Sequence, residues 1–588
     1  MCGIIGYKGQ RNVNQVIIDG LKQMEYRGYD SFGIAAISEG KLFLHKQVGK
    51  VGDFSFEQLK FENCDAAIGH TRWATHGAVT ETNAHPHLSA DKRFALAHNG
   101  VVENYQELKK ELISKGYNFK TQTDTESIVY LIEEELKQNE IKQAVANAFK
   151  KIKGRTAILL LDSKTEQLIC ARRGSPLIIG IGENEHFVAS DATAFIDKTK
   201  SAIFLDDEDC AVINGSLEIF DMQTGNIKTK KAEILPLACD YAKKGNYPHF
   251  MLKEIFEQKF TIRQAIMQWE EKIKEIANDI NNAFGTYAVG CGTAGKVCLT
   301  GTYFFSEIAN KHINFTFGSE FPSYHHFLKE KSLLLVVSQS GETADTIQAA
   351  QTMKQRGGKV ISIVNVAGST IARMSDKFLL VNCGPEIAVC STKATTGQIS
   401  IMLLLAYACS DRYFEGQELL KKTADYVSEM TSEEFNDKIK NLAKQIKNWE
   451  SMYVIARGVN YPIALESAIK IQEVSYVHAE GFAGGELKHG PIALISKGTP
   501  CIAFVANDSV KKEILSNAME VKSRGGLIIG VAPENNEIFD VHIKVPDVGI
   551  ASPIVNIIPI QLLAYHLAIE KGYDPDKPRN LAKSVTVA

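Results

Sequence analysis

Hydrophobic and polar residues alternate along short segments in the N-terminal part of the chain. Residues 33–37 and 41–44 are typical of strands in an antiparallel arrangement. Two longer stretches, residues 12–24 and 124–138, are amphipathic at helical spacing. The second starts with the sequence TDTE at 123–126, whose side chains can accept hydrogen bonds from free N–H groups at a helix start. The pattern predicts sheets covered by helices rather than a doubly wound parallel sheet.

The second half of the chain repeats one arrangement of apolar strands and helices. Three strands recur in each copy, at residues 287–290, 333–337 and 357–361 and then at 452–456, 501–505 and 525–529. In both copies the first strand runs into a glycine turn and a helix, and a second helix ends in Gly-Gly before the third strand. Apolar strands that alternate with helices predict two parallel α/β domains in tandem.

A polar segment separates these halves. It contains a basic patch at 228–231 and two prolines, Pro236 and Pro248, and it is followed by residues 249–258, which have helical spacing. We expect a domain boundary near residues 239–245. The predicted organisation is an N-terminal domain, a linker, two α/β domains and a C-terminal tail, at residues 2–225, 226–270, 271–418, 442–579 and 580–588.

The composition is that of an ordinary globular protein, with 45% hydrophobic and 23% charged residues. A chain of 588 residues predicts several domains. A net charge of −3 gives no electrostatic signature of nucleic-acid or membrane binding. No apolar run reaches the roughly 18 residues of a membrane span, and the N-terminus lacks the pattern of a signal peptide.

The 11 cysteines are scattered, with no C-x-x-C pair and no spacing typical of zinc ligands. Most lie in apolar runs and are expected to be small buried hydrophobic residues, which indicates a reducing cytoplasm and no metal. Cys2 is the one cysteine whose position needs a chemical explanation. If Met1 is removed, the α-amine of Cys2 is a base on the same residue as a thiol, as in N-terminal-nucleophile hydrolases. The alternative is an apolar first strand that happens to follow a cysteine.

Polar residues gather in three motifs of the N-terminal domain: YRGYDS at 26–31, GHTRWATHG at 69–77 and HNG at 98–100. Singly, each has an ordinary structural explanation, such as a surface arginine or an Asn-Gly turn. Together they offer the parts of an amide hydrolase. Arg72 can grip an α-carboxylate and Asp124 an α-ammonium, while the Asn99 amide and the Gly100 N–H can stabilise an oxyanion. A substrate with an amino-acid head and a side-chain amide is glutamine.

With the Cys2-Gly3-Ile4 start and TDTE, these motifs occur in the order of the class II glutamine amidotransferase domain, which the N-terminal part resembles. The resemblance implies an αββα N-terminal-nucleophile hydrolase sandwich in which Cys2 is acylated by the glutamyl group and ammonia is released. It also implies that Asn99 and Gly100 form the oxyanion hole and that Trp73 gates an ammonia channel. The implied glutamine-binding residues are Arg27, Arg72, Trp73, Thr75, His76 and Asp124.

In the first α/β copy, the sequence SQSGET at 338–343 joins an apolar strand to a helix. Ligands bind at the carboxyl ends of parallel strands, and hydroxyls on a turn beside a helix N-terminus suit a phosphate. No G-x-x-x-x-G-K-[ST] motif is present, so a nucleoside triphosphate is not indicated. A serine-rich helix cap is the alternative.

SQSGETADT and the sequence GPEIAVCSTK at 384–393 resemble the tandem sugar isomerase (SIS) domains of hexosamine-forming amidotransferases, and HFMLKEIFEQ at 249–258 resembles their joining segment. The sugar-phosphate contacts implied by the resemblance are Thr293, Ser338, Gln339, Ser340, Thr343, Val389, Ser391 and Ala582. This chain departs from the family at Ala294, where a serine is usual, and at residues 321–326, which lack the usual arginine. Both departures leave the exact sugar open.

The second copy has acid–base residues instead. Glu473 lies on a predicted helix one turn after Lys470, and His489 lies in the charged loop GGELKHGP at 484–491. A carboxylate and a histidine near a sugar can move protons between adjacent carbons and open a ring. A helix ion pair and a solvated loop are the alternative. The tail sequence PRNLAKSVTV at 578–587 resembles the family's C-terminus, in which the lysine, here Lys583, meets the sugar carbonyl and can form a Schiff base.

The resemblance covers the whole chain and implies that D-fructose 6-phosphate and L-glutamine become D-glucosamine 6-phosphate and L-glutamate. It implies that Lys583 engages the ketose, that Glu473 moves a proton between C1 and C2, and that His489 opens the ring from the neighbouring subunit of a homodimer. We expect no metal, nucleotide or pyridoxal cofactor, no nucleic-acid or membrane partner, and a cytoplasmic location. The alternatives are a paralogue that aminates another phosphorylated sugar and a sugar-phosphate-binding regulator with residual glutaminase activity. A deglycase with the same SIS core would lack the amidotransferase half.

Overall fold

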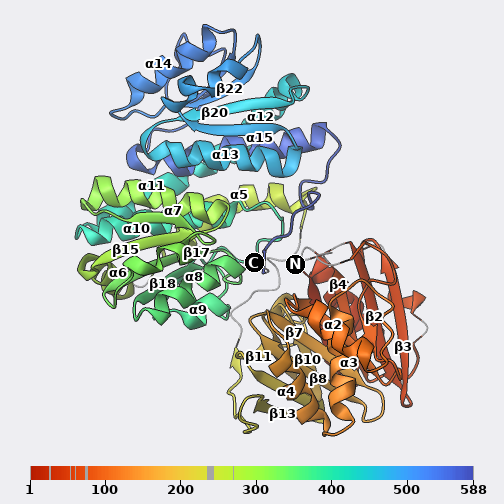
Figure 1. Cartoon of the computed structure of the whole chain (residues 1–588). Helices are drawn as coiled ribbons and strands as arrows, with labels where there is room; N and C mark the ends of the chain where they lie inside the picture. The colour runs from red at the N-terminus through yellow and green to blue at the C-terminus, as the bar shows by residue number, and fades with distance from the viewer. Residues whose placement is uncertain are drawn as a thin grey trace. The chain divides into compact units, whose positions relative to one another are not determined.

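The structure is a computed structural model. It describes residues 2–25, 28, 30–52, 54–59, 61–72, 77–234, 244–268 and 270–586. The chain divides into two units, of which the first comprises Met1–Cys239 and Ser584–Ala588 and the second comprises Asp240–Lys583. Each unit has its own sheets and core (Figure 1).

The described part of the first unit stacks two antiparallel sheets against each other. One has the strand order β14-β11-β9-β10-β1-β4-β2-β3 and the other the order β13-β12-β8-β7-β6-β5. The strands of the first sheet are β1 (Gly3–Lys8), β2 (Ser31–Ser38), β3 (Lys41–Val48), β4 (Ala66–Arg72), β9 (Ile178–Gly182), β10 (Glu185–Ala189), β11 (Ser201–Phe204) and β14 (Glu233–Ile234). Those of the second are β5 (His87–Leu88), β6 (Phe94–Gly100), β7 (Thr156–Asp162), β8 (Gln167–Arg173), β12 (Asp209–Asn214) and β13 (Ser216–Asp221).

Helices cover the outer faces of both sheets. Helix α1 (Val13–Gln23) packs on the first sheet, and α2 (Tyr105–Ser114), α3 (Thr125–Leu136) and α4 (Ile141–Lys151) pack on the second. The alternation of side chains builds these layers: Leu159 of β7 points into the core between the sheets, whereas its neighbours Ile158 and Leu160 pack against the helices. The predicted αββα sandwich is therefore confirmed.

The predicted strands and helices of this unit are confirmed, but one predicted helix cap is wrong. Asn12 caps α1, since its side chain accepts a hydrogen bond from the Gln15 N–H. Asp124, by contrast, precedes α3 without a side-chain capping bond. Its Oδ2 accepts a hydrogen bond from the Val102 N–H at 2.7 Å instead. A carboxylate can accept a hydrogen bond either from an N–H group at the helix start or from one elsewhere. Here it accepts from Val102, which lies in a loop 22 residues earlier.

The second unit contains two parallel sheets within its described residues, with the orders β16-β15-β17-β18-β19 and β21-β20-β22-β23-β24. In each sheet the second strand in sequence lies at the edge, next to the first. The strands are β15 (Gly285–Gly290), β16 (Asn314–Phe317), β17 (Ser332–Ser338), β18 (Lys359–Val364), β19 (Lys377–Leu380), β20 (Ser451–Ala456), β21 (His478–Ala483), β22 (Pro500–Phe504), β23 (Leu527–Ala532) and β24 (Val541–Lys544). The identical order confirms the predicted duplication of a doubly wound fold.

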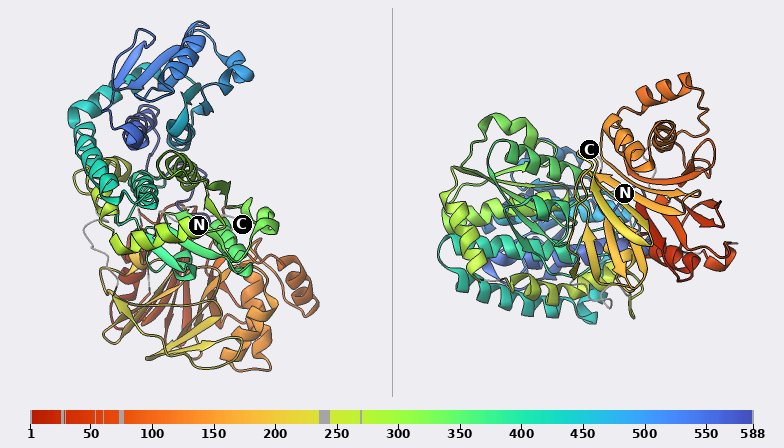
Figure 2. Two further views of the ribbon diagram at one scale, coloured as in Figure 1. Left: turned by 90° about the vertical axis from the view of Figure 1, so that its left-hand side faces the viewer. Right: turned by 90° about the horizontal axis from the view of Figure 1, so that it is seen from below.

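Most helices of this unit lie between the two sheets and share one hydrophobic core with them (Figures 1 and 2). The helices of the shared core are α5 (Phe250–Ile266), α6 (Glu270–Asn282), α7 (Thr293–Ala309), α10 (Lys393–Cys409), α11 (Tyr413–Met430), α12 (Glu433–Ile446), α13 (Tyr461–Ser475) and α15 (Ser552–Glu570). The remaining helices, α8 (Ala344–Gln355), α9 (Thr370–Met374) and α14 (Lys511–Lys522), belong to the smaller cores of the two copies. The two copies therefore pack as a single unit.

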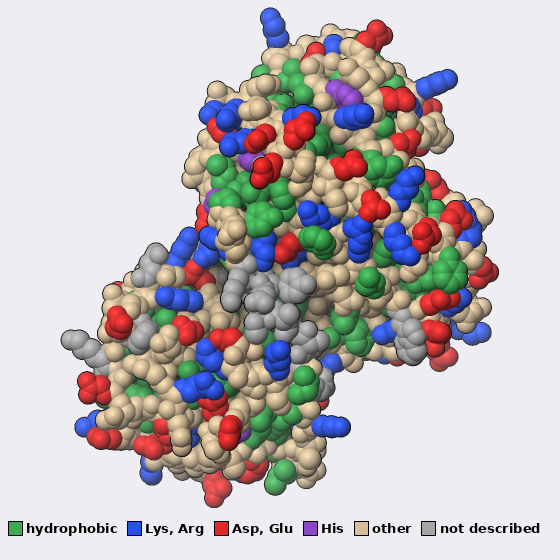
Figure 3. All heavy atoms as spheres, turned by 180° about the vertical axis from the view of Figure 1, so that it is seen from behind, with side chains coloured by type: hydrophobic (Ala, Val, Ile, Leu, Met, Phe, Trp, Pro, Cys, Tyr) green, Lys and Arg blue, Asp and Glu red, His purple; other side chains and the backbone are tan. Residues whose placement is uncertain are grey.

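One segment, Gly549–Glu570, is long and apolar enough to cross a membrane, although sequence inspection found no such run. Of its most apolar window, 94% is buried inside the structure, as in the core helix of a soluble protein. On the face shown in Figure 3, basic and acidic side chains are interspersed. Neither feature indicates a membrane protein.

Because the two copies share one core, its helices should carry much of the stability of the second unit. Leu403 of α10 has no exposed surface, so Leu403→Ala should destabilise this unit by about 2–5 kcal/mol. Leu494→Ala is the matched control, since 63% of that side chain is exposed. Differential scanning calorimetry should show a lower melting temperature for the first variant only, and equal shifts would contradict the assigned core.

Candidate active sites

The first candidate site lies where Cys2 enters strand β1. The Gly3 N–H donates to the Thr71 Oγ1 of the neighbouring strand β4 at 3.1 Å. From β6, the Asn99 Nδ2 donates to the Cys2 carbonyl oxygen at 2.9 Å. Gly100 follows with a φ of +135°, and a Cβ there would lie 1.9 Å from the Arg155 carbonyl oxygen, so only glycine fits. The structure thus brings three of the predicted residues together, Cys2 from the start of β1 in one sheet and Asn99 and Gly100 from the end of β6 in the other.

Arg72 lies at the end of β4 and is 2% exposed. Its guanidinium donates to the carbonyl oxygens of Ala78 at 3.0 Å and Gly77 at 3.1 Å, contacts that the sequence did not predict. Burial lowers the pKa of Arg72, and this effect is opposed by the negative charges that Cys2, Asp30 and Asp124 can carry. The predicted residues Arg27, Trp73, Thr75 and His76 lie outside the described residues.

Four buried histidines, which sequence reasoning missed, lie next to this site. The rings of His70 and His85 stack with their centroids 4.1 Å apart, and the His85 and His87 rings meet edge to face. The Thr125 hydroxyl lies 3.0 Å from the His98 Nδ1 and 3.2 Å from the His85 Nε2. Burial holds the pKa values of His70, His85 and His87 well below the ordinary range, so these rings are neutral. His70 and His98 lie within the motifs at 69–77 and 98–100, whereas the sequence HPH at 85–87 is the signal for His85 and His87.

In the second unit, the predicted phosphate loop joins β17 to α8. The Ser338 Oγ accepts from the Gly341 N–H at 3.0 Å, and the Ser340 Oγ accepts from the Glu342 N–H at 3.2 Å. Gly341 has a φ of +64°, which closes the turn. Thr343 precedes α8 and makes no side-chain capping bond to it. The first turn of the helix therefore presents N–H groups that can receive an anion.

A buried ion-pair cluster joins the two α/β copies. Lys470 of α13 is fully buried, and its Nζ lies 2.8 Å from the Glu473 Oε2 and 3.3 Å from the Glu466 Oε1. The same Nζ donates to the Thr293 Oγ1 at 3.1 Å, and that hydroxyl donates to Glu466 at 2.9 Å. Thr293 opens α7 of the first copy. Two predicted residues, Thr293 and Glu473, are thus held by the same ammonium.

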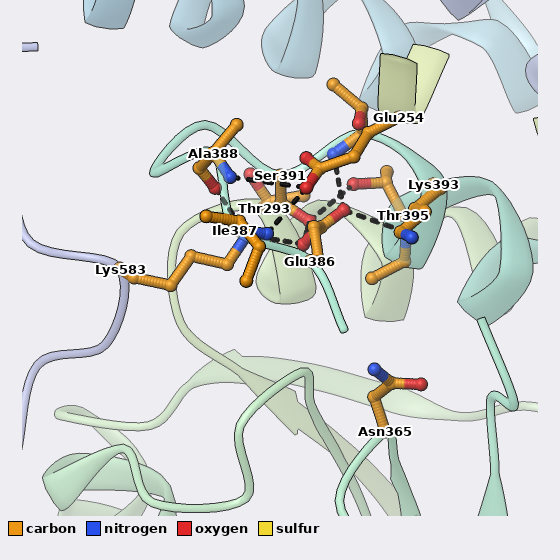
Figure 4. A network of polar contacts seen from close by, with 12 residues as sticks. Glu254, Thr293, Asn365, Glu386, Ile387, Ala388, Ser391, Lys393, Thr395 and Lys583 are labelled. Atoms are coloured by element: carbon orange, nitrogen blue, oxygen red, sulfur yellow. Dashed lines mark hydrogen bonds and ion pairs between the residues drawn. The ribbon is translucent and has the colours of Figure 1, made fainter. Parts of the chain in front are cut away.

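Lys583 of the C-terminal tail makes a second buried pair (Figure 4). Its Nζ lies 2.5 Å from the Glu386 Oε2 and donates to the Ala388 carbonyl oxygen at 2.8 Å. Glu386 also accepts from the Ser391 hydroxyl at 3.0 Å, so Lys583 and Ser391 share one carboxylate. Of the other sugar-contact candidates, Gln339 lies in the loop after β17, Val389 in the loop before α10 and Ala582 in the C-terminal tail.

Further acidic residues surround this pair. The Glu254 Oε1 of α5 accepts from the Ile387 N–H at 2.5 Å, and Lys393 lies 2.7 Å from Glu257 (Figure 4 labels Glu254, Ile387 and Lys393). Burial, reinforced by the charge of Glu386, raises the pKa of Glu254 to about 8, whereas Lys583 and its neighbours hold the pKa of buried Glu386 below its ordinary value. Glu254, Glu386 and Glu466 were missed as site residues, because nothing in the local sequence marks them as buried.

His489 lies apart from these pairs. It ends the short 3₁₀ helix Glu486–His489 and is exposed. In the part of the chain that the structure describes, no hydrogen bond or ion pair joins it to Glu473 or Lys583. The described residues also contain no group of three or more His, Cys, Asp or Glu side chains that could hold a metal ion.

Comparisons with known proteins match different families of domain to the N-terminal and C-terminal parts of the chain. A glutamine amidotransferase domain model matches residues 70–197, and a SIS domain model matches residues 280–408 and 445–571. The chain is 42% identical over 598 residues to a glutamine–fructose-6-phosphate aminotransferase (isomerizing) from Pyrococcus horikoshii, and 41% identical over 604 residues to one from Thermococcus kodakarensis. Both alignments cover 100% of each chain. A solved C-terminal domain of glucosamine-fructose-6-phosphate aminotransferase from Francisella tularensis aligns with a TM-score of 0.51 at 32% identity, covering 57% of this chain and 99% of that one.

The raised pKa of Glu254 gives a pH prediction. The folded protein keeps this proton up to about pH 8, whereas the ordinary carboxyl loses it near 4.5. Between those values the folded state binds more protons, so a rise in pH lowers the contribution of Glu254 to stability. Relative to the wild type, Glu254→Gln should therefore gain melting temperature as the pH rises from 5 to 8.

The matched control is Glu271→Gln, which changes an exposed glutamate of α6. Its melting temperature, measured in the same buffers, should follow that of the wild type. A difference between Glu254→Gln and the wild type that is constant with pH would contradict the assigned protonation.

Proposed function

Because this chain belongs to the glutamine–fructose-6-phosphate aminotransferase (isomerizing) family, we propose that its two units divide one reaction between them. The first hydrolyses L-glutamine to L-glutamate and ammonia. The second uses that ammonia to convert D-fructose 6-phosphate to D-glucosamine 6-phosphate. Identity over the full length of both relatives supports the reaction, and the bond from Asn99 to Cys2 is the observation that carries the first half.

In the glutaminase half, Cys2 is the nucleophile, and its α-amine, once Met1 is removed, is the base that takes the thiol proton. The thiolate attacks the side-chain amide of glutamine, and the resulting oxyanion is stabilised by the Asn99 amide and the Gly100 N–H. Arg72 and Asp124 hold the carboxylate and ammonium of the substrate, with Arg27, Trp73, Thr75 and His76 completing the pocket. Burial of Arg72 supports this role, because a guanidinium shielded from water binds a carboxylate more strongly.

In the sugar half, the phosphate binds the loop of Ser338, Gln339, Ser340 and Thr343, together with Thr293. The uncapped start of α8 and the turn at Gly341 support this assignment. Val389, Ser391 and Ala582 contact the sugar. Ala294 stands where a serine is usual, so this chain lacks one hydroxyl there. Because α7 begins at Thr293, its first backbone N–H groups can still bind the phosphate.

Lys583 then engages the ketose carbonyl. Its ammonium gives up a proton, and the free amine condenses with C2 to a Schiff base and water, after which ammonia displaces the lysine. Glu473 moves a proton from C1 to C2, and the proton of the C1 hydroxyl passes to the imine nitrogen, which leaves an aldehyde at C1 and the amine at C2. The contact with Lys470 supports this role of Glu473, because it fixes the direction of the carboxylate.

His489 opens the sugar ring of a neighbouring subunit, and the protein works as a homodimer in the cytoplasm. The separation of His489 from the Lys583 pair within one chain supports a contribution to another copy. The free thiols of the described cysteines other than Cys2 support a reducing compartment.

The two half-reactions should be separable by mutation. Cys2→Ala should abolish glutamine hydrolysis and glutamine-dependent synthesis, because no other group can be acylated, while the binding of fructose 6-phosphate remains. Lys583→Ala should stop sugar conversion but keep basal glutamine hydrolysis. Glutamate release and amino-sugar formation are measured for each variant, and unchanged turnover of Cys2→Ala would sink the nucleophile assignment.

Product analysis decides which sugar is aminated. The protein is incubated with glutamine and a panel of hexose phosphates, and the aminated product is identified by mass spectrometry and chromatography. We expect glucosamine 6-phosphate from fructose 6-phosphate only. Amination of a different sugar in its place would favour a paralogue, for which Ala294 is the observation.

A further inference from the structure

Lys583 of the C-terminal tail must lose an ammonium proton before its amine can attack a carbonyl carbon. The Lys583 Nζ lies 2.5 Å from the Glu386 Oε2 (Figure 4). Water has little access to this pair, since the Glu386 side chain has no exposed surface and that of Lys583 is 5% exposed. Among the described residues, Glu386 is the one carboxylate that forms an ion pair with Lys583. The structure thus offers a proton acceptor in direct contact with the amine.

The two carboxylate oxygens of Glu386 have different partners. Oε1 accepts from the N–H groups of Thr392 at 2.9 Å and Ala394 at 3.0 Å, at the start of α10. Oε2 accepts from the Lys583 ammonium and also from the Ser391 hydroxyl at 3.0 Å. Backbone donors therefore hold the carboxylate in place by one oxygen, and the other oxygen stays directed at the amine of Lys583.

A second buried carboxyl group, that of Glu254 on α5, holds the adjacent peptide. Its Oε1 accepts from the N–H groups of Ile387 at 2.5 Å and Ala388 at 3.3 Å. The Ala388 carbonyl oxygen in turn accepts from the Lys583 Nζ at 2.8 Å. Burial and the charge of Glu386 raise the pKa of Glu254, so Glu254 is neutral and the negative charge beside Lys583 belongs to Glu386.

Charge balance favours a proton transfer within the pair of Lys583 and Glu386. Burial raises the pKa of Glu386, and the charge of Lys583 opposes this effect. If the amine lost its charge to water, the Glu386 carboxylate would stay buried without its counter-charge, which is costly. A proton that moves from Nζ to Oε2 instead turns the ion pair into two neutral groups. The neighbouring pair of Lys393 and Glu257, 2.7 Å apart, is balanced by itself.

We propose that Glu386 is the catalytic base and acid of Schiff-base formation at Lys583, which rests on the function proposed above. Glu386 takes one proton from the ammonium, and the free Nζ attacks the carbonyl carbon of the ketose. A second proton passes from Nζ to the former carbonyl oxygen, which becomes a hydroxyl. Glu386 then returns its proton to this hydroxyl, which leaves as water while the C–N double bond forms. One proton stays on the nitrogen, so the product is an iminium cation that again faces the Glu386 carboxylate.

Borohydride, which reduces a Schiff base to a stable secondary amine, tests this step on the full-length protein. The protein is mixed with fructose 6-phosphate without glutamine and quenched with borohydride at set times, and the adduct at Lys583 is quantified by peptide mass spectrometry. Glu386→Gln should form the adduct at least about a hundredfold more slowly than the wild type, because acid–base catalysis typically contributes about 10²–10⁴ in rate. Glu330→Gln, which changes an exposed glutamate of the same α/β copy, is the matched control and should react like the wild type.

The pH dependence separates proton transfer from a purely structural role of Glu386. In Glu386→Gln the ammonium must lose its proton to water, so the rate of adduct formation should rise more steeply with pH than in the wild type. Glu386→Asp keeps a carboxylate and should recover part of the rate without this steeper rise. A Glu386→Gln rate that is lower than the wild-type rate by the same factor at every pH would contradict the proposal, as would equally slow reaction of both variants.

The same experiment distinguishes this proposal from the proposed function. Adduct formation at the wild-type rate in Glu386→Gln overturns the role of Glu386 and leaves the Schiff base at Lys583 intact. Absence of any adduct in the wild type overturns the Schiff base itself, and the role of Glu386 with it. Circular dichroism checks that each variant is folded, and the Glu386→Asp comparison still decides the matter where the glutamine variant does not fold.

Discussion

A fully buried ammonium, that of Lys470, constrains the whole second unit. Burial alone would lower the pKa of this lysine, but the carboxylates of Glu466 and Glu473 hold it well above the ordinary value. An unpaired charge in this position would cost several kcal/mol, so the chain can bury Lys470 only together with its partners. One of these, Thr293, belongs to the first copy, whereas Glu473 belongs to the second. The ion pairs lie within α13, and the hydrogen bonds of Thr293 with Lys470 and Glu466 link this buried cluster to the start of α7.

The same constraint explains why the C-terminal tail reaches the sugar site. Glu386 is buried in a loop of the first copy, and Lys583 supplies its counter-charge from the other end of the chain. Glu254 adds a second acidic group, which stays protonated at neutral pH because it is buried and because two carboxylates so close in a dry site cannot both be ionised at low cost. Segments far apart in sequence are therefore joined by charge compensation, and Lys583 is held next to Ser391 before any substrate arrives.

The sequence predicted the layers of the fold well because they depend on local periodicity. The short alternating segments at 33–37 and 41–44 predicted strands, and the repeated strand–helix pattern predicted two parallel sheets; the structure has β2 and β3 at the first and the two sheets of the second unit. The family motifs also led to Cys2, Asn99 and Gly100, which lie together. Pairings between distant segments could not be predicted in this way. Glu386 lies within the motif at 384–393, but only the fold reveals that it faces Lys583.

Asp124 and Arg72 illustrate the same limit in the first unit. Their residue types indicated that they could cap a helix or bind a substrate, but several donors and acceptors compete for each of them. In the folded chain the Asp124 carboxylate accepts a hydrogen bond from the Val102 N–H, and the Arg72 guanidinium donates to two carbonyl oxygens. The buried histidines beside them gave still less signal, because a neutral ring in a core is indistinguishable in sequence from a catalytic one.

The two copies of the α/β fold share their strand order and turns but differ in the side chains at their strand ends. Both copies have the same strand order and the same left-handed glycine after the first strand, so the turns at this place correspond. In the first copy the residues at this place carry hydroxyl groups. The carboxylates beside Thr293 and Lys470, those of Glu466 and Glu473, belong to helix α13 of the second copy. Because α13 turns Glu473 and Lys470 toward the first copy, the strand ends of the second copy are left without this acid and base. Their side chains were therefore free to diverge, and the strand end after β20 carries Arg457, whose guanidinium donates to the Asn517 side chain.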